Sequence, residues 1–257
     1  MAQAPVTLRS PGEGRAELVF HEARLEPAVC AAALGLLEAL REQDGLRVVT
    51  LRGGAAGESA AGDSAVGAWP LPPETPDLEG LALAGRMVEA VAALPTPVLA
   101  VMAGEVRAEG LELALACDLR LAARSARFAM PHLAEGRLPC CGGSQRLPRL
   151  VGLSAAFELF FAEGWDAERA EALGLVSEGV AAGELAGAGT RWAERLAEKA
   201  PIAARFLKEV VRRGMEVPLD QGLLIEEDAY LLLQTTEDRL EGIRAFLEKR
   251  PPRFKGK

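Results

Sequence analysis

The segment Pro95–Gly152 constrains the fold of this 257-residue chain more than any other part. It opens with a continuous apolar run at 97–103, which predicts a buried strand. A short apolar helical segment follows at 110–117 and carries one acidic residue, Glu112. A second strand pair is expected next, and then a helix that opens at Gly142. If the protein is an enzyme, we expect its catalytic residues in this segment.

The same order of strands and helices precedes this segment. Alternating apolar residues around Pro-Gly and Gly predict a hairpin over 5–20, and Pro27 opens a helix. A β-branched run predicts a strand over 46–54, which leads into a long proline-rich loop over 53–80. A helix is expected over 78–93. The recurrence of strand–strand–helix units predicts a wound, layered α/β architecture.

Helical patterns dominate the C-terminal part of the chain. Three segments are expected there, over 182–201, 202–214 and 218–250. We therefore divide the chain into a core at 1–190 and a helical region at 191–257, which would serve as a lid and an assembly surface.

Charge and hydropathy exclude several classes of protein. The formal net charge of −8 gives no electrostatic support for nucleic-acid binding. No apolar run reaches the roughly 18–20 residues that span a bilayer, and the first residues lack the pattern of a signal peptide. We expect a cytoplasmic protein with neither a nucleic-acid nor a membrane partner.

Cysteine and histidine usage predicts no metal site. Cys140 and Cys141 are adjacent, which suits neither a C-x-x-C metal motif nor an easy disulfide. The two histidines, His21 and His132, have no partner residues at ligand spacing. The sequence G-E-S-A-A at 57–61 lacks the last glycine of a nucleophile elbow, and no dinucleotide or phosphate-binding glycine motif is present.

Three residues of the central segment are candidates for acid–base chemistry. Glu112 lies between Leu111 and Leu113, where an ionised carboxylate is costly unless it is paired, and such a group is suited to proton transfer. The alternative is an acid on the solvent face near a helix N-terminus. His132 and Glu135 are three residues apart and would share one face of a helical turn, although each could equally be a surface residue.

Backbone amides offer a second kind of site. Gly142 and Gly143 open a helix whose N-terminus favours an anion, or they form a plain turn. The amides near Gly62 and near Glu109–Gly110 each follow a strand and could together donate to a developing oxyanion.

These residues resemble the crotonase, or enoyl-CoA hydratase/isomerase, superfamily from about residue 5 to 257. The resemblance rests on five stretches taken together: PVLAVMAG at 97–104, GLELALACDLRLAARSARFAMP at 110–131, GGSQRLPRLVG at 142–152, AERAEALGLVSEGV at 167–180 and TEDRLEGIRAFLEKRPPRFKGK at 236–257. The strand over 46–54 with SAAGD at 59–63 resembles the family's strand and oxyanion loop. The resemblance implies a spiral of ββα units with a helical C-terminal region, assembled as a homotrimer or a dimer of trimers.

The resemblance also implies a ligand and a site. The substrate would be an acyl-CoA thioester, with coenzyme A as part of the substrate and no separate cofactor. Two backbone amides, of Gly62 and Glu109, would stabilise the thioester enolate, and Glu112 would be the first catalytic carboxylate. Residues implied in substrate binding are Ala60, Asp63, Gly110, Gly142, Phe254 and Lys255.

The chain departs from the family pattern at two positions. The second catalytic glutamate of hydratases falls on His132, and the glycine run before Glu112 reads Ala108-Glu109-Gly110. A backbone amide can still donate from Glu109. We expect an acyl-CoA lyase or isomerase, most simply a hydratase, in which Glu112 is assisted by His132 or Glu135. The alternatives are isomerase or decarboxylase chemistry, a non-catalytic acyl-CoA-binding member and, weakly, an RNA-binding relative.

Overall fold

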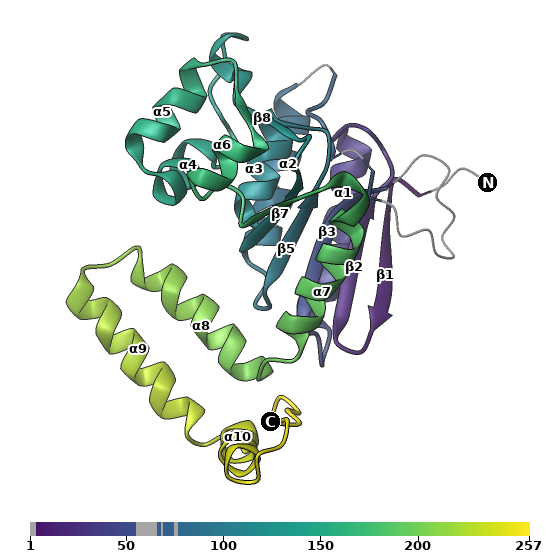
Figure 1. Ribbon diagram of the computed structural model, residues 1–257. Helices are drawn as coiled ribbons and strands as arrows, with labels where there is room; N and C mark the ends of the chain where they lie inside the picture. The colour runs from purple at the N-terminus through teal and green to yellow at the C-terminus, as the bar shows by residue number, and fades with distance from the viewer. Residues whose placement is uncertain (1–3, 55–65, 68, 75–76) are drawn as a thin grey trace.

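The computed structural model describes residues 4–54, 66–67, 69–74 and 77–257, and a mainly parallel sheet forms its centre (Figure 1). The strands run in the order β1-β2-β3-β5-β7-β10, with β4 paired to the end of β3. All pairs are parallel except β1–β2 and β3–β4. Their bounds are β1 Val6–Gly12, β2 Arg15–Phe20, β3 Val48–Gly54, β4 Val66–Gly67, β5 Val98–Met102, β7 Leu119–Ala123 and β10 Glu178–Val180. The predicted hairpin over 5–20 is confirmed as β1–β2.

The middle strands of the central sheet, β3 and β5, are buried on both faces. Along β5, Val98, Ala100 and Met102 belong to the larger apolar cluster, while Leu99 and Val101 belong to a second cluster on the other face. Strands buried on both faces read as continuous apolar runs, which explains the pattern at 97–103. The larger cluster includes α1 (Pro27–Glu42) and α2 (Leu78–Ala92), and the second is covered by α7 (Leu185–Ala197).

A smaller sheet lies beside the first and corrects one prediction. It consists of β6 (Glu105–Arg107), β8 (Arg127–Ala129) and β9 (Trp165–Asp166), in the order β6-β8-β9. The two strands expected after the central helix are present as β7 and β8, but their expected pairing is wrong, because they belong to different sheets. Each finds its hydrogen-bond partners in strands distant along the sequence.

Helix α3 (Ala108–Ala116) connects the two sheets and is buried along its whole length. It packs between α2 and α4 (Gly143–Val151), with α5 (Leu153–Phe161) and α6 (Ala167–Ala172) beyond (Figure 1). Two short 3₁₀ turns complete this region, η1 at Pro131–Leu133 and η2 at Ala182–Glu184. An acidic residue anywhere on α3 is thereby removed from solvent.

The C-terminal helices extend away from the sheet (Figure 1). They are α8 (Pro201–Gly214), α9 (Leu219–Leu233) and α10 (Glu237–Leu247). The single helix expected over 218–250 is wrong, because this segment forms two helices, α9 and α10. Thr236 lies between them, and its hydroxyl oxygen caps α10 by accepting from the Arg239 amide at 3.1 Å. The expected boundary at 190 falls inside α7, which packs on the sheet.

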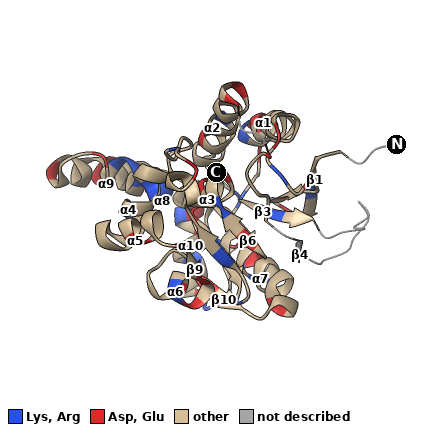
Figure 2. Ribbon diagram, turned by 90° about the horizontal axis from the view of Figure 1, so that it is seen from above, with Lys and Arg blue, Asp and Glu red and all other residues tan. Residues whose placement is uncertain are grey.

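Ion pairs tie α8 to the core. Basic residues gather on this helix (Figure 2). Asp118, which follows α3, accepts from Lys208 Nζ at 2.7 Å and from the Arg212 guanidinium at 2.8 Å. Burial lowers the pKa of Lys208, and the neighbouring Asp118 carboxylate opposes that shift. Within the described part of the chain, no helix has the length and apolarity needed to cross a membrane.

Candidate active site

The candidate site is built on the first turn of α3. This helix starts directly after β6, and Ala108 at its start has a φ of 46°, in the left-handed region. Glu109 and Glu112 are three residues apart, so both project from one side of the helix. Both are fully buried, with 0% exposure. The alternative that Glu112 faces solvent is therefore wrong.

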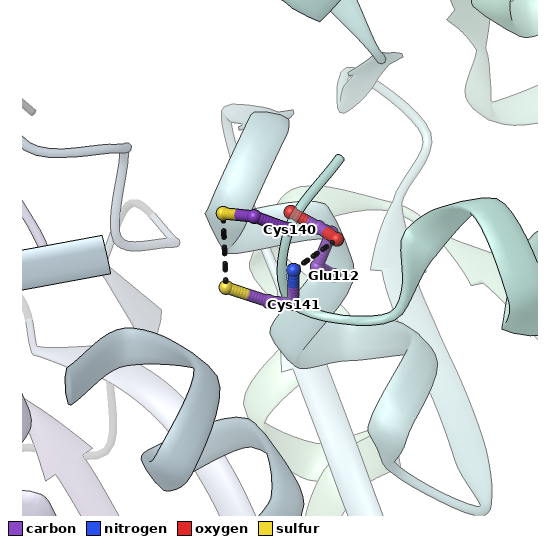
Figure 3. A group of neighbouring side chains, drawn as sticks. All are labelled: Glu112, Cys140 and Cys141. Atoms are coloured by element: carbon purple, nitrogen blue, oxygen red, sulfur yellow. Dashed lines mark hydrogen bonds between the residues drawn. The ribbon is translucent and has the colours of Figure 1, made fainter. Parts of the chain in front are cut away.

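Glu112 is held through one of its two carboxylate oxygens. Its Oε1 accepts from the backbone amide of Cys141 at 2.8 Å and from that of Gly143 at 2.7 Å. Figure 3 shows the carboxylate beside the loop that carries the Cys141 amide. Its Oε2 is buried and has no hydrogen-bond partner among the described residues. Oε1 is thus held in place by two amides, and Oε2 is available to a water molecule or a ligand.

His132 lies against the available oxygen. Its side chain comes from η1 and is 1% exposed. The ring Nε2 is 3.5 Å from Glu112 Oε2 and 3.8 Å from Glu109 Oε1. Neither ring nitrogen has a hydrogen-bond partner within the described part of the chain. Buried polar atoms without partners in a native fold mark places where water or a ligand binds.

An arginine that the sequence analysis missed neutralises Glu109. Arg137 Nη1 donates to Glu109 Oε1 at 2.7 Å, and Arg137 Nη2 donates to Glu135 Oε2 at 2.5 Å. Partial burial lowers the pKa of the Arg137 guanidinium. The hydrogen bonds to the two carboxylates raise this pKa by more, so the net shift is upward. Arg137 and Glu109 are 28 positions apart, so no local spacing signals the contact.

Glu135 is turned away from the buried pair of Glu112 and His132. Its carboxylate lies at the surface, 39% exposed, and is 3.7 Å from Arg107 as well as bonded to Arg137. The structure therefore brings Glu109, Glu112 and His132 together and leaves Glu135 at the rim, where it helps to hold Arg137.

Two glycines permit the close packing around α3. A Cβ on Gly110 would lie 2.2 Å from the carbonyl oxygen of Pro70, whose neighbour Trp69 donates its indole N–H to the Gly110 carbonyl at 2.7 Å. A Cβ on Gly143 would lie 2.9 Å from both Cγ and Oε1 of Glu112. Gly142 precedes α4 with a φ of 93°, which confirms the predicted glycine-opened helix.

Replacing Gly143 with alanine should displace the Glu112 carboxylate. We expect a loss of about 1–3 kcal/mol in the free energy of unfolding, because the added methyl group overpacks a buried site. Gly35→Ala in α1 is the matched control, since its Cβ would meet nothing within 4 Å. Denaturant unfolding of both variants measures the difference. Equal stability of the two would contradict the proposed crowding.

The remaining residues implied by the resemblance are either outside the described part of the chain or in the terminal tail. Ala60, Gly62 and Asp63 fall outside the described residues, so the first oxyanion amide and this part of the loop remain predictions. Phe254 and Lys255 belong to the terminal tail, which lies below the sheet and apart from α3 (Figure 1). There Phe254 O accepts from Arg47 at 2.7 Å and Lys255 N donates to Asp238 at 2.6 Å. The structure does not bring this tail to Glu112 of the same chain.

Two groups of side chains are close enough to hold a cation. Potential ligand atoms of Glu109, Glu112 and His132 lie within 4.8 Å of one another, as do those of Glu112, Cys140 and Cys141. Spacing along the sequence could not reveal these groups, because each combines residues from separate elements. In the first group Arg137 already supplies a positive charge at Glu109.

Comparisons with known proteins identify the family. The sequence profile of the enoyl-CoA hydratase/isomerase family matches residues 25–257. The chain is 40% identical over 258 residues to the mitochondrial enoyl-CoA hydratase domain-containing protein 2 of Bos taurus, covering 97% of this chain and 87% of that protein. The chain therefore belongs to the enoyl-CoA hydratase/isomerase family, which is a family of enzymes.

Further comparisons agree with this assignment. Mitochondrial methylglutaconyl-CoA hydratase of Mus musculus is 44% identical over 175 residues, which is 66% of this chain and 56% of that protein. A crystal structure of enoyl-CoA hydratase from Bacillus anthracis superimposes with a TM-score of 0.89 at 31% identity, covering 98% of this chain and 100% of that one. The fold is the crotonase fold, as the resemblance implied.

Proposed function

We propose that this chain adds water to a 2-enoyl-CoA thioester and that Glu112 transfers the protons. The observation that carries the proposal is the arrangement of its carboxylate, with Oε1 bound by two amides and Oε2 buried beside His132. A fixed carboxylate with one free oxygen can accept a proton from a water molecule and return a proton to the α-carbon. The substrate class follows from family membership and from the hydratases among the relatives.

Backbone donors would stabilise the thioester enolate. The Glu109 amide lies in the first turn of α3, where the helix offers no acceptor for it and the helix dipole favours negative charge. The negative side chain of Glu109 would oppose an enolate, but its contact with Arg137 offsets that charge. We infer that Glu109 serves through its amide, paired with the amide of Gly62 as the resemblance implies.

His132 is the second proton-transfer group in this proposal. Replacing it with alanine should lower turnover by about 10²-fold, because a positioned group that gives and accepts protons is lost. The measurement is kcat with crotonyl-CoA for both proteins. Unchanged turnover would move the role to Glu135 or to bound water, and Glu135→Gln tests that alternative.

A spectrophotometric assay with crotonyl-CoA tests the function directly. Loss of the conjugated enoyl thioester, with formation of a 3-hydroxyacyl-CoA product, supports hydration. A shifted double bond or release of carbon dioxide from a suitable acyl-CoA would instead indicate isomerase or decarboxylase chemistry. Absence of all three reactions would overturn the proposal.

A binding role without turnover is the second candidate. It is favoured by the Glu109 side chain, which stands where the family has glycine and is fully buried. In that case an acyl-CoA should raise the melting temperature while no product forms, because a ligand that binds only the folded state stabilises it. No shift and no turnover would exclude both candidates.

Assembly as a homotrimer or a dimer of trimers is also proposed. Large apolar side chains are exposed along the C-terminal helices, among them Leu207, Val211, Leu223, Tyr230, Leu231 and Phe246. Apolar surface of this extent is typical of protein interfaces. Light scattering coupled to size-exclusion chromatography measures the mass. Cytoplasmic location stays a prediction, and the Bos taurus and Mus musculus relatives are named as mitochondrial proteins.

A further inference from the structure

The loop before α4 carries two adjacent thiols that face each other. Cys140 is exposed and Cys141 is buried, and their Sγ atoms are 3.8 Å apart (Figure 3). The pair stands at the edge of the site, because the backbone amide of Cys141 is one of the two donors that hold Glu112. Neither thiol has a role in the proposed hydration.

The two thiols differ in their access to solvent. Cys140 is exposed, whereas Cys141, Cys30 and Cys117 are buried. Burial raises the pKa of Cys30 to about 11 and that of Cys117 to about 12. Cys140 is therefore the sulfur of the four that a soluble oxidant reaches first, and Cys141, whose Sγ is 3.8 Å away, is placed to resolve the product.

An open pocket gives a small oxidant access to the pair. It has a volume of about 580 Å³ and is lined by Cys140, Cys141 and Gly142 on one side and by residues of α1 and α2 on the other. Its charged lining residues are Arg41, Arg86 and Glu89. The pocket therefore lets a small solute reach the pair from solvent.

Closing a bond between neighbouring cysteines must distort the peptide that joins them. Consecutive Cα atoms are about 3.8 Å apart across a trans peptide, whereas disulfides usually join Cα atoms about 4.4–6.8 Å apart. The joining peptide contains the Cys141 amide that binds Glu112 Oε1. Gly142, with its φ of 93°, follows directly and can absorb the backbone change. Oxidation of the pair is thus mechanically coupled to the position of Glu112.

We propose that Cys140 and Cys141 are a reversible oxidation site at which a hydroperoxide closes a vicinal disulfide and withdraws the Cys141 amide from Glu112. The Cys140 thiolate attacks the terminal oxygen of the peroxide, an S–O bond forms and the O–O bond breaks. The leaving oxygen takes a proton and departs as an alcohol, or as water when the oxidant is hydrogen peroxide. The Cys141 sulfur then attacks the Cys140 sulfenic acid, the S–S bond forms, and the hydroxide leaves as water with the Cys141 proton. Two electrons pass from the thiols to the peroxide.

Peptide mass analysis tests the chemical step. Trypsin should release residues 138–146, which contain Cys140 and Cys141 and no other cysteine. After hydrogen peroxide, this peptide should be lighter by two hydrogen atoms, resist alkylation, and recover both thiols with dithiothreitol, while Cys30 and Cys117 remain alkylatable. Oxygen addition without closure, a link to another chain, or no change would overturn the proposal. Cys141→Ser is the matched variant and should stop at oxygen addition on Cys140.

The coupling is tested on the same oxidised protein. Hydrogen exchange at the Cys141 and Gly143 amides should accelerate, because their acceptor is lost or displaced. Turnover should fall about tenfold or more and return with dithiothreitol, as expected for losing a hydrogen bond to a charged group. Only the turnover measurement rests on the proposed function, since mass and exchange need no activity. A closed disulfide with unchanged exchange at both amides would overturn the coupling.

Discussion

Glu112→Gln should lower the rate of enoyl-CoA hydration by about 10²–10⁴-fold while the protein stays folded. Glutamine can still accept the Cys141 and Gly143 amides through its carbonyl oxygen, so the hydrogen bonds that hold the side chain remain possible. It cannot accept a proton from water or return one to the α-carbon. It also removes a buried charge, so the melting temperature should match or exceed that of the wild type.

The measurement is kcat with crotonyl-CoA beside a thermal melt. Glu158→Gln is the control, because it makes the same change at a carboxylate on α5, outside the site. Its partners are Arg169 at 2.8 Å and the Trp165 indole N–H at 2.9 Å. Turnover retained by Glu112→Gln would transfer the acid–base role to His132 or Glu135. Turnover lost equally in both variants would point to a general effect of the substitution.

The central segment was predictable because its signals are local. The apolar run at 97–103 predicts a strand, and the glycines at 142–143 predict the start of a helix. The position of Glu112 between two leucines favours a buried carboxylate. Each of these patterns spans only a few residues. The structure confirms the buried strand β5 and the helix that starts at Gly143. For Glu112 the sequence left a buried and a solvent-facing position open, and the structure shows the buried one. These features depend on the spacing of apolar residues and on the backbone freedom of glycine, and both can be read directly from the sequence.

The contacts that complete the site were not predictable in the same way. Arg137 reaches Glu109, and the amides at 141 and 143 reach Glu112, across about thirty positions of chain. Only the assembled fold brings η1 and the loop before α4 to the first turn of α3. The end of one helix and the start of the next at Thr236 were not predicted for a different reason. The residues on both sides favour helix, and a single capping hydroxyl is a weak signal between them.

The loss of Arg137 should destabilise the protein more than any other single change near the site. Arg137→Met leaves the fully buried Glu109 carboxylate without its cation. Removing one partner of a buried pair costs about 3–5 kcal/mol, and we expect the lower end of that range because Arg137 itself is 22% exposed. Methionine keeps much of the side chain's apolar bulk. Urea unfolding at one fixed protein concentration measures the change, since any assembly makes stability depend on concentration.

A second substitution separates the charge from the packing. Adding Glu109→Gln to Arg137→Met removes the stranded charge, so the double variant should recover most of the stability that the single variant loses. If the double variant is as unstable as Arg137→Met alone, the loss comes from packing of the arginine stem. If Arg137→Met is as stable as the wild type, the arginine is not what holds Glu109. Recovery in the double variant would show that Arg137 is the residue that lets a glutamate occupy the position where the family has glycine.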